Sequence, residues 1–250
     1  MSVMTELVHY DVVDGVATIT LDSPHNRNAL SQQLTTELLA ALERAAADDA
    51  ARIVLLQAAG TVFCSGADLS EAATVPMDQG ARVIVALQRA IVAHPKPVVT
   101  RLAGAVRAGG IGLVAASDIV VAAEDASFAL TEVRLGLAPA AISLTVLPRL
   151  TSRAAASTFL TGRVFTGDEA RDLGLVTTAV PADRLDTEVE AVVAQLLLGV
   201  PQGLRETKAL MNAALLDRID AHGEEMATLS ARLFGSDQAR EAMLAFLAKR

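Results

Sequence analysis

The sequence predicts an α/β fold that ends in a helical region, and two observations carry that prediction. In the first half of the 250-residue chain, short apolar or β-branched runs alternate with longer segments whose apolar residues recur at helical spacing. That alternation is typical of parallel strands joined by helices. From residue 184 onward, each apolar pattern has helical spacing and none has that of a strand. We therefore expect an α/β core over residues 1–183 and a helical region over residues 184–250.

The first-half elements follow from local patterns. Residues 16–21 alternate as a strand does, and they are expected to form a hairpin with residues 8–12 across Asp14 and Gly15. Ser31 is a suitable N-cap for a helix that extends to about Ala47. Continuous apolar runs predict buried strands, and a helix is expected before the prolines at 95 and 97. The strands are predicted at residues 53–58, 98–102 and 119–122, and the helices at residues 79–93 and 109–116.

The second half is read mainly as helices. One strand is expected, over residues 175–180, before Pro181. The helices are predicted at residues 140–150, 152–160, 167–173, 184–198, 203–216, 223–234 and 236–249.

Composition and charge exclude several function classes. The chain is 52% hydrophobic and 20% charged, which is typical of a soluble globular protein with a sizeable core. Its net charge of −8 argues against a nucleic-acid partner. No uninterrupted apolar run reaches the ~18 residues of a membrane span, so no membrane association is expected. The single cysteine and the absence of signal-peptide features predict a cytoplasmic protein.

Two turns of small residues are candidates for binding an anion. The turn at residues 63–69 follows a predicted strand, and the glycines at 109 and 110 open a predicted helix. Backbone N–H groups are exposed at such positions and attract negative charge. Glu132 lies about ten residues beyond the next predicted strand and is the candidate acid. Two donor turns and one acid suggest a site that holds an anion made from a carbonyl, where one lost donor typically costs about 10²–10³ in rate.

Simpler explanations exist for each of these features. The glycines can serve only to pack a helix closely on a sheet, and Glu132 can be an acid favoured by a helix N-terminus. The glycine spacing is not that of a dinucleotide-binding loop. Ser65 lacks a recognisable base, and Cys64 is expected to be buried rather than reactive. The four histidines have no partner at metal-ligand spacing, so no metal is expected.

Several motifs in order resemble the enoyl-CoA hydratase/isomerase (crotonase) superfamily, and the resemblance covers nearly the whole chain. The motifs are NAL (28–30), FCSGADL (63–69), AGGIGL (108–113), SDI (117–119), EVRLGLAP (132–139), RVFTGDEA (163–170), GLV (174–176) and EAMLAFLAKR (241–250).

The resemblance implies a crotonase-type spiral of repeated β-β-α units with a C-terminal helical region, assembled as a homotrimer or homohexamer. It implies an acyl-CoA thioester as substrate, no separate cofactor, and a role in fatty-acid metabolism. The amides of Ala67 and Gly109 would form the oxyanion hole for an enolate, and the helical region would contribute subunit contacts and part of the CoA site. The residues implied in CoA binding are Ser65, Ala67, Asp68, Leu69, Ser70, Gly109, Phe234 and Lys249.

One position departs from the family pattern. Typical hydratases carry glutamates at the positions of Gly112 and Glu132, and this chain keeps only the second. A positioned acid or base is worth about 10²–10⁴ in rate, so the loss has consequences. Glu132 alone could activate water and serve the α-carbon, or it could move a proton between carbons as in single-glutamate isomerases. Alternatively, the site could stabilise an enolate made by decarboxylation or another bond cleavage.

The wording of residues 109–116 and 132–143 is similar to that of methylglutaconyl-CoA-type hydratases, which favours hydration. Arg107 and Arg134 would then be candidates to contact a second carboxylate of the acyl chain, or they are surface arginines. The alternative to all of these reactions is a non-catalytic acyl-CoA-binding protein that kept the fold and lost one acid.

Overall fold

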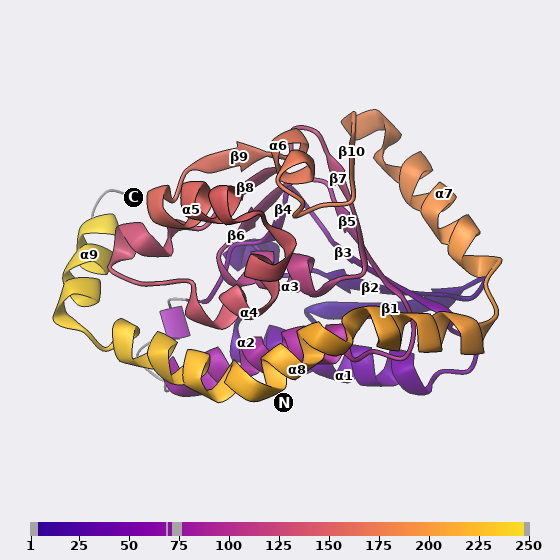
Figure 1. Ribbon diagram of the computed structural model, residues 1–250, viewed down its shortest axis with the longest axis horizontal. Coiled ribbons are helices and arrows are strands. Elements are labelled where there is room, and N and C mark those ends of the chain that lie inside the picture. Colours follow the sequence, from indigo (N-terminus) through magenta and orange to yellow (C-terminus); the bar gives the residue numbers. More distant parts are fainter. Residues whose placement is uncertain (1–4, 69, 72–76, 248–250) are drawn as a thin grey trace.

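Two β-sheets form the core of the computed structural model, which describes residues 5–68, 70–71 and 77–247 (Figure 1). The larger sheet has six strands in the order β1-β2-β3-β5-β7-β10, and the smaller has four in the order β4-β6-β8-β9. Neighbouring strands are parallel except in the pairs β1/β2 and β8/β9. The six-stranded sheet comprises β1 (Val8–Val13), β2 (Val16–Leu21), β3 (Ile53–Ala58), β5 (Val98–Leu102), β7 (Ile119–Ala123) and β10 (Thr178–Val180). The four-stranded sheet comprises β4 (Val62–Cys64), β6 (Ala105–Arg107), β8 (Ser127–Ala129) and β9 (Val164–Thr166).

The chain alternates between the two sheets. β3, β5 and β7 of the larger sheet are followed after short turns by β4, β6 and β8 of the smaller one. A helical segment then leads back to the larger sheet in the first two of these units: α2 (Met77–Val92) after β4 and α3 (Gly109–Ala116) after β6. After β8 come the 3-10 helix η3 (Thr131–Leu135) and α4 (Ala140–Arg149). This repeated β-β-α path confirms the predicted α/β spiral.

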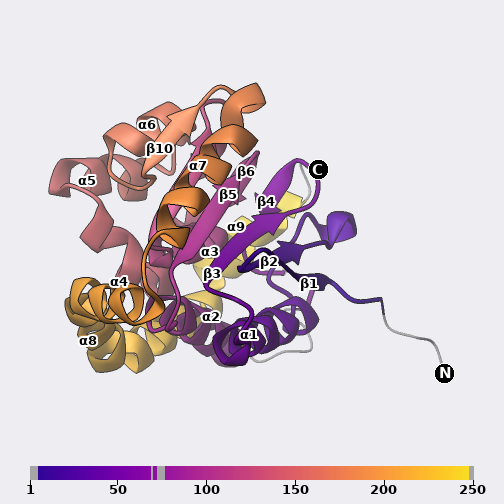
Figure 2. The same cartoon turned by 90° about the vertical axis from the view of Figure 1, so that its right-hand side faces the viewer.

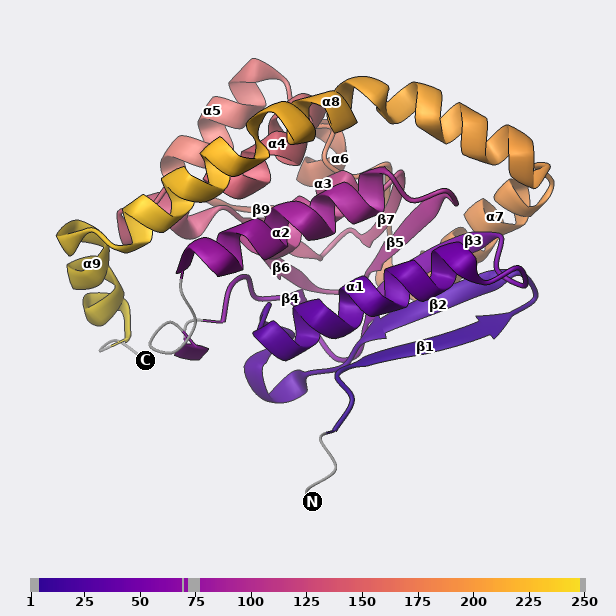
Figure 3. The same cartoon turned by 90° about the horizontal axis from the view of Figure 1, so that it is seen from below.

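Helices cover the sheets from more than one side. α1, α2 and α8 lie side by side along the lower edge of Figure 1, and Figure 3 shows them lengthwise. α7 instead packs against β3, β5 and β7 (Figure 2). Every described element after residue 181 is helical, and no described helix is long and apolar enough to cross a bilayer. The remaining helices are α1 (Gln32–Ala47), α5 (Ser152–Thr161), α6 (Gly167–Asp172), α7 (Leu185–Leu197), α8 (Pro201–Phe234) and α9 (Asp237–Leu247), with short 3-10 turns η1 (Pro24–Asn26) and η4 (Ala182–Arg184).

The sequence predicted the larger sheet better than the smaller one. The β1/β2 hairpin, the strands β3, β5 and β7, and the N-cap of α1 are confirmed, with the Ser31 side chain accepting a hydrogen bond from the Leu34 amide. The four-stranded sheet was not predicted, because each of its strands has only three residues. The strand expected over residues 175–180 is also shorter, since only residues 178–180 pair with β7.

The prediction of two helices over residues 203–216 and 223–234 is wrong, because α8 is continuous through both. Gly223 was taken as the start of a new helix, yet it lies inside α8. A Cβ atom at this position would lie 2.9 Å from Cγ1 of Val85 on α2. The glycine therefore serves close packing between the two helices rather than a helix break.

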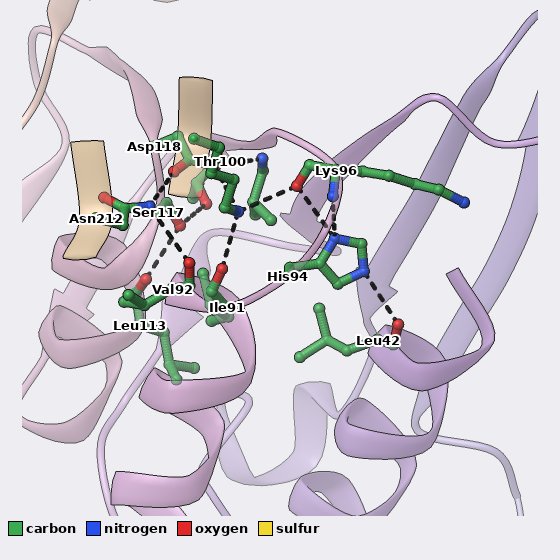
Figure 4. A network of polar contacts seen from close by, with 12 residues as sticks. Leu42, Ile91, Val92, His94, Lys96, Thr100, Leu113, Ser117, Asp118 and Asn212 are labelled. Atoms are coloured by element: carbon green, nitrogen blue, oxygen red, sulfur yellow. Dashed lines mark hydrogen bonds and ion pairs between the residues drawn. The ribbon is translucent and has the colours of Figure 1, made fainter. Parts of the chain in front are cut away.

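A buried polar network fixes α8 to the end of α2 (Figure 4). The Lys208 ammonium lies 2.7 Å from the Asp118 carboxylate and donates to the carbonyl of Ile91 at 3.0 Å. The Asn212 amide donates to the same carboxylate at 2.9 Å and to the carbonyl of Val92 at 3.3 Å. Burial lowers the pKa of Lys208, and the attraction of Asp118 partly offsets that effect. These two side chains cap the C-terminus of α2, so they fix α8 to α2.

Candidate active site

The predicted site residues follow three adjacent parallel strands. Ala67 comes after β4, Gly109 after β6 and Glu132 after β8. Because the carboxyl ends of parallel strands meet at one edge of a sheet, the structure brings these three residues to the same edge. Ligands commonly bind at such edges in α/β proteins. The site therefore belongs to the four-stranded sheet.

The turn before Ala67 packs directly on the start of α3. Gly66 has φ +92, and a Cβ there would lie 2.8 Å from Cβ of Ala108 and 3.6 Å from the nitrogen of Gly109. Only glycine fits this combination of positive φ and close approach. Ala108 itself has φ +45 and ψ −119, a conformation that L-residues rarely adopt. Backbone strain of this kind clusters at functional sites.

The amides of Ala67 and Gly109 are available for a ligand. Ala67 pairs with Leu30 in a parallel bridge, in which the Leu30 amide donates to the Gly66 carbonyl at 2.8 Å. Gly109 is the first residue of α3, where N–H groups have no partner within the helix. Within the part of the chain that the structure describes, no protein oxygen accepts a hydrogen bond from either amide. The geometry thus supports the predicted pair of donors, whose role stays a prediction.

Glu132 carries the strongest electrostatic signal at this edge. Its Oε2 is the one buried side-chain nitrogen or oxygen, among the described residues, that lacks a hydrogen-bond partner. Burial raises the pKa of the Glu132 carboxyl to about 7, although its own backbone amide opposes the shift. An acid that merely stabilises a helix N-terminus needs no burial, which costs free energy. The simpler explanation therefore fits Glu132 less well than acid–base chemistry near neutral pH.

The segment that carries Glu132 is held from the C-terminal side of the chain. η3 begins directly after the buried Leu130 and ends at Gly136, which has φ +69. α9 packs against η3, and a Cβ at Gly136 would lie 3.2 Å from the nitrogen of Ala239. No local pattern could indicate that the last helix supports the acid, because the contact joins residues about a hundred positions apart.

The residues predicted to follow the CoA form a hydrogen-bonded turn beside Ala67. The Ser65 hydroxyl donates to the carbonyl of Asn26 at 3.1 Å. Asp68 accepts hydrogen bonds from the Asn26 amide at 2.9 Å and from the Ser70 hydroxyl at 2.6 Å. Partial burial alone would raise the pKa of Asp68, but these hydrogen bonds outweigh it and lower that pKa. These hydrogen bonds hold Ser65, Asp68 and Ser70 beside Ala67, and their part in CoA binding stays a prediction.

The other predicted residues contact neighbouring segments, are partly buried, or lie outside the described part of the chain. Phe234 is half-buried at the end of α8. Leu69 and Lys249 lie outside the described residues. The Arg107 guanidinium donates to the carbonyl and hydroxyl of Ser127, and Arg134 lies within hydrogen-bond distance of the Thr161 carbonyl.

Both arginines thus already hold neighbouring segments, so their contact with a second carboxylate stays a prediction. Cys64 is fully buried, as expected from the sequence, and burial raises the pKa of its thiol to about 12.

Sequence reasoning missed the residues that face Gly112. A Cβ at Gly112 would lie 2.6 Å from Cγ2 of Ile142 and 3.3 Å from Cδ of Gln88. The one signal in the sequence was the glycine at position 112, because a glycine inside a helix often indicates that another element approaches closely. The partner could not be found, because α2 and α4 are distant from α3 along the chain.

The sequence and the overall fold of this chain are similar to those of known proteins. The sequence model of the family described as enoyl-CoA hydratase/isomerase matches residues 11–250. A Rhodobacter capsulatus protein described as a probable enoyl-CoA hydratase is 34% identical, with 97% of this chain and 95% of that protein covered. The 1,2-epoxyphenylacetyl-CoA isomerase of Escherichia coli is 31% identical, with 99% and 97% covered. The crystal structure of an enoyl-CoA hydratase from Mycobacterium avium is 49% identical, with a TM-score of 0.92 over 99% of this chain and 98% of that one.

Proposed function

The chain belongs to the enoyl-CoA hydratase/isomerase family, and we propose on that premise that it adds water reversibly to an α,β-unsaturated acyl-CoA. The observation that carries the proposal is the buried, unpaired Oε2 of Glu132, with its pKa near 7. A carboxyl in that state can both accept and return a proton at neutral pH. The relatives described as enoyl-CoA hydratases favour hydration over other reactions of the family.

In the proposed mechanism the thioester oxygen lies between the amides of Ala67 and Gly109. The Glu132 carboxylate takes a proton from water while the water oxygen bonds to Cβ of the substrate. The π electrons move toward the thioester, and the resulting enolate oxygen is stabilised by the two amides. The protonated Glu132 then returns its proton to Cα, so that one water has been added and the enzyme is unchanged.

Double-bond isomerisation is the second candidate, and a specific observation favours it. Gly112 supplies no acid, and Ile142 fills the space beside it. A single carboxyl can remove a proton from one carbon of the acyl chain and deliver it to another. The similarity to an isomerase over nearly the whole chain is consistent with this alternative.

A substrate panel in labelled water separates these functions. The purified protein is incubated with crotonyl-CoA, methylglutaconyl-CoA and a 3-enoyl-CoA, once in D₂O and once in H₂¹⁸O. Hydration predicts ¹⁸O in the product, and isomerisation predicts a shifted double bond without ¹⁸O. Tight binding of these thioesters without turnover or deuterium exchange would contradict both and favour a non-catalytic acyl-CoA-binding protein.

We further propose that residues 184–250 contribute subunit contacts in a homotrimer or homohexamer, and that Phe234 and Lys249 complete the CoA site of a neighbouring subunit. The resemblance to the family supports this arrangement. Solution mass by light scattering tests the assembly, and a Phe234→Ala variant with an unchanged KM for the thioester would remove that residue from the CoA site.

A further inference from the structure

The start of α3 packs against two other helices with almost no free space. Residues 109 and 112 lie one turn apart on the same side of α3. A Cβ at Gly109 would lie 2.8 Å from Cδ1 of Leu30 and 3.5 Å from Cδ1 of Ile84 on α2, and a Cβ at Gly112 would meet Gln88 of α2 and Ile142 of α4. The atoms nearest to a Cβ at position 112 belong to Ile142: its Cγ2 would lie at 2.6 Å and its Cβ at 3.0 Å. Both atoms lie close to the backbone of α4, so no flexible tip can move aside.

A buried hydrogen-bond network holds Ile142 in this place. The Thr145 hydroxyl donates to Oε1 of Gln88 at 2.6 Å and lies 3.1 Å from the carbonyl oxygen of Gly112. Nε2 of Gln88 donates to the carbonyls of Ile84 and Ala141, each at 3.1 Å. Gln88 and Thr145 are both completely buried. Because every polar atom of the Gln88 side chain has a partner, α2, α3 and α4 are locked together one turn behind the Gly109 amide.

We propose that Ile142 confines the acid–base chemistry of this site to Glu132, because it occupies the space into which a side chain at position 112 would project. Gln88 and Thr145 are the positioning residues that keep Ile142 there. The inference rests on the proposed function, in which Glu132 moves the proton. It extends that function in one respect. The chain lacks a second acid at position 112, and the packing of Ile142 also leaves no room for one.

A stability cycle tests the steric part without any substrate. Alanine is favoured over glycine in a helix, so Gly112→Ala would raise the melting temperature if the space were open. The proposal expects Gly112→Ala to lower it and Ile142→Ala to relieve part of that loss in the double variant. A Gly112→Ala variant as stable as the wild type, or losses that simply add in the double variant, would overturn the proposal.

A second experiment tests the chemical consequence. Hydration of crotonyl-CoA and exchange of its α-proton with D₂O are measured for Ile142→Ala with and without Gly112→Glu. We expect the double variant to hydrate at least about tenfold faster than Ile142→Ala, since a positioned acid contributes about 10²–10⁴ in rate. Equal hydration rates in two folded variants that still exchange the α-proton would overturn the proposal. If the glutamate variant does not fold, the alanine cycle decides.

Matched controls separate this role from a loss of packing. Val146→Ala truncates a buried aliphatic side chain one turn further along α4, and it should leave the ratio of hydration to exchange unchanged. Thr145→Ser keeps the hydroxyl and should keep the wild-type ratio, whereas Thr145→Val should alter it. If Glu132→Gln leaves both wild-type rates unchanged, the proposed function itself has failed, which is a different result from any outcome above.

Discussion

The two sheets of this protein differ in how they are specified and in what they do. The six-stranded sheet has strands of five or six residues, apart from β10, and most were evident as continuous apolar or alternating runs. The four-stranded sheet has strands of three residues, and the sequence did not reveal it. Yet Ala67, Gly109 and Glu132 all follow strands of the smaller sheet. The larger sheet is the scaffold, and the spiral path places the proposed site on the smaller one.

The comparison predicts its largest effect for the acid at the end of β8. Glu132→Gln should lower turnover of an enoyl-CoA by about 10²–10⁴, because the amide cannot carry the proton. The same change at Glu124, which directly follows β7 and precedes β8, should leave turnover intact. Steady-state kinetics with crotonyl-CoA measure both. Wild-type turnover in Glu132→Gln would break the assignment of chemistry to the smaller sheet.

The scaffold side predicts a large effect on stability rather than on chemistry. Lys208→Met leaves the Asp118 carboxylate, whose side chain is 11% exposed, without the buried ammonium 2.7 Å away, which should cost about 3–5 kcal/mol in the free energy of unfolding. The exposed pair of Arg89 and Asp220 joins the same two helices, so Arg89→Met is a matched control and should cost at most about 1 kcal/mol. Urea denaturation followed by circular dichroism compares the two variants. Equal losses would show that the buried network is not what secures α8.

The two regions should also respond to pH in opposite directions. Burial raises the pKa of Glu132 from 4.5 to about 7, so its contribution to stability is complete below pH 4.5 and is lost as pH rises through 7. As pH rises from 4.5 to 7, the free energy of unfolding of Glu132→Gln should therefore increase by about 2–3 kcal/mol relative to that of the wild type.

His94 of the scaffold behaves conversely. Burial lowers its pKa, and its Nδ1 accepts from the amide of Lys96 while Nε2 lies 3.2 Å from the carbonyl of Leu42, a pattern of the neutral imidazole. The contribution of neutral His94 to the stability of the fold is present above pH 6.5 and is lost as pH falls through the lowered pKa. Denaturation across pH 4.5–8 for wild type, Glu132→Gln and His94→Gln measures both trends. A pH profile that neither variant changes would contradict the assignment.

The smallest predicted effect concerns backbone strain beside the oxyanion amides. Ala108→Gly should raise the free energy of unfolding by about 1 kcal/mol, because glycine adopts φ +45 without penalty. It should also lower turnover severalfold, because the Gly109 amide is then less rigidly held. Asp14→Gly is the matched control in the β1/β2 turn, at φ +49, and should leave turnover unchanged. Unchanged turnover in Ala108→Gly as well would mean that the strain has no functional role.

The sequence predicted the elements whose signals are local, and it could not predict contacts between distant segments. The apolar run of β3 and the N-cap of α1 were read correctly, since each is written in a few consecutive residues. The strand β6 holds only Ala105–Arg107, too short for any periodicity. Gly223 was misread because a glycine that ends a helix and one that admits a neighbour look alike in sequence.

The same distinction between local signals and distant contacts applies to the candidate site. Glu132 and the two amides were predicted from turns, from one acid and from family motifs. The burial that raises the pKa of Glu132 and the contact of Ile142 with position 112 arise only when the sheets and helices pack, and no local pattern encodes them.

We propose that the ends of β4, β6 and β8 form one site in which Glu132 carries the proton. A crystal structure of the Glu132→Gln variant with a bound enoyl-CoA tests it most directly. We expect the thioester oxygen to lie about 3 Å from the nitrogens of both Ala67 and Gly109, with the side chain at 132 beside the reacting carbons. A thioester bound away from these two amides, or a residue 132 that faces no part of the acyl group, would contradict it.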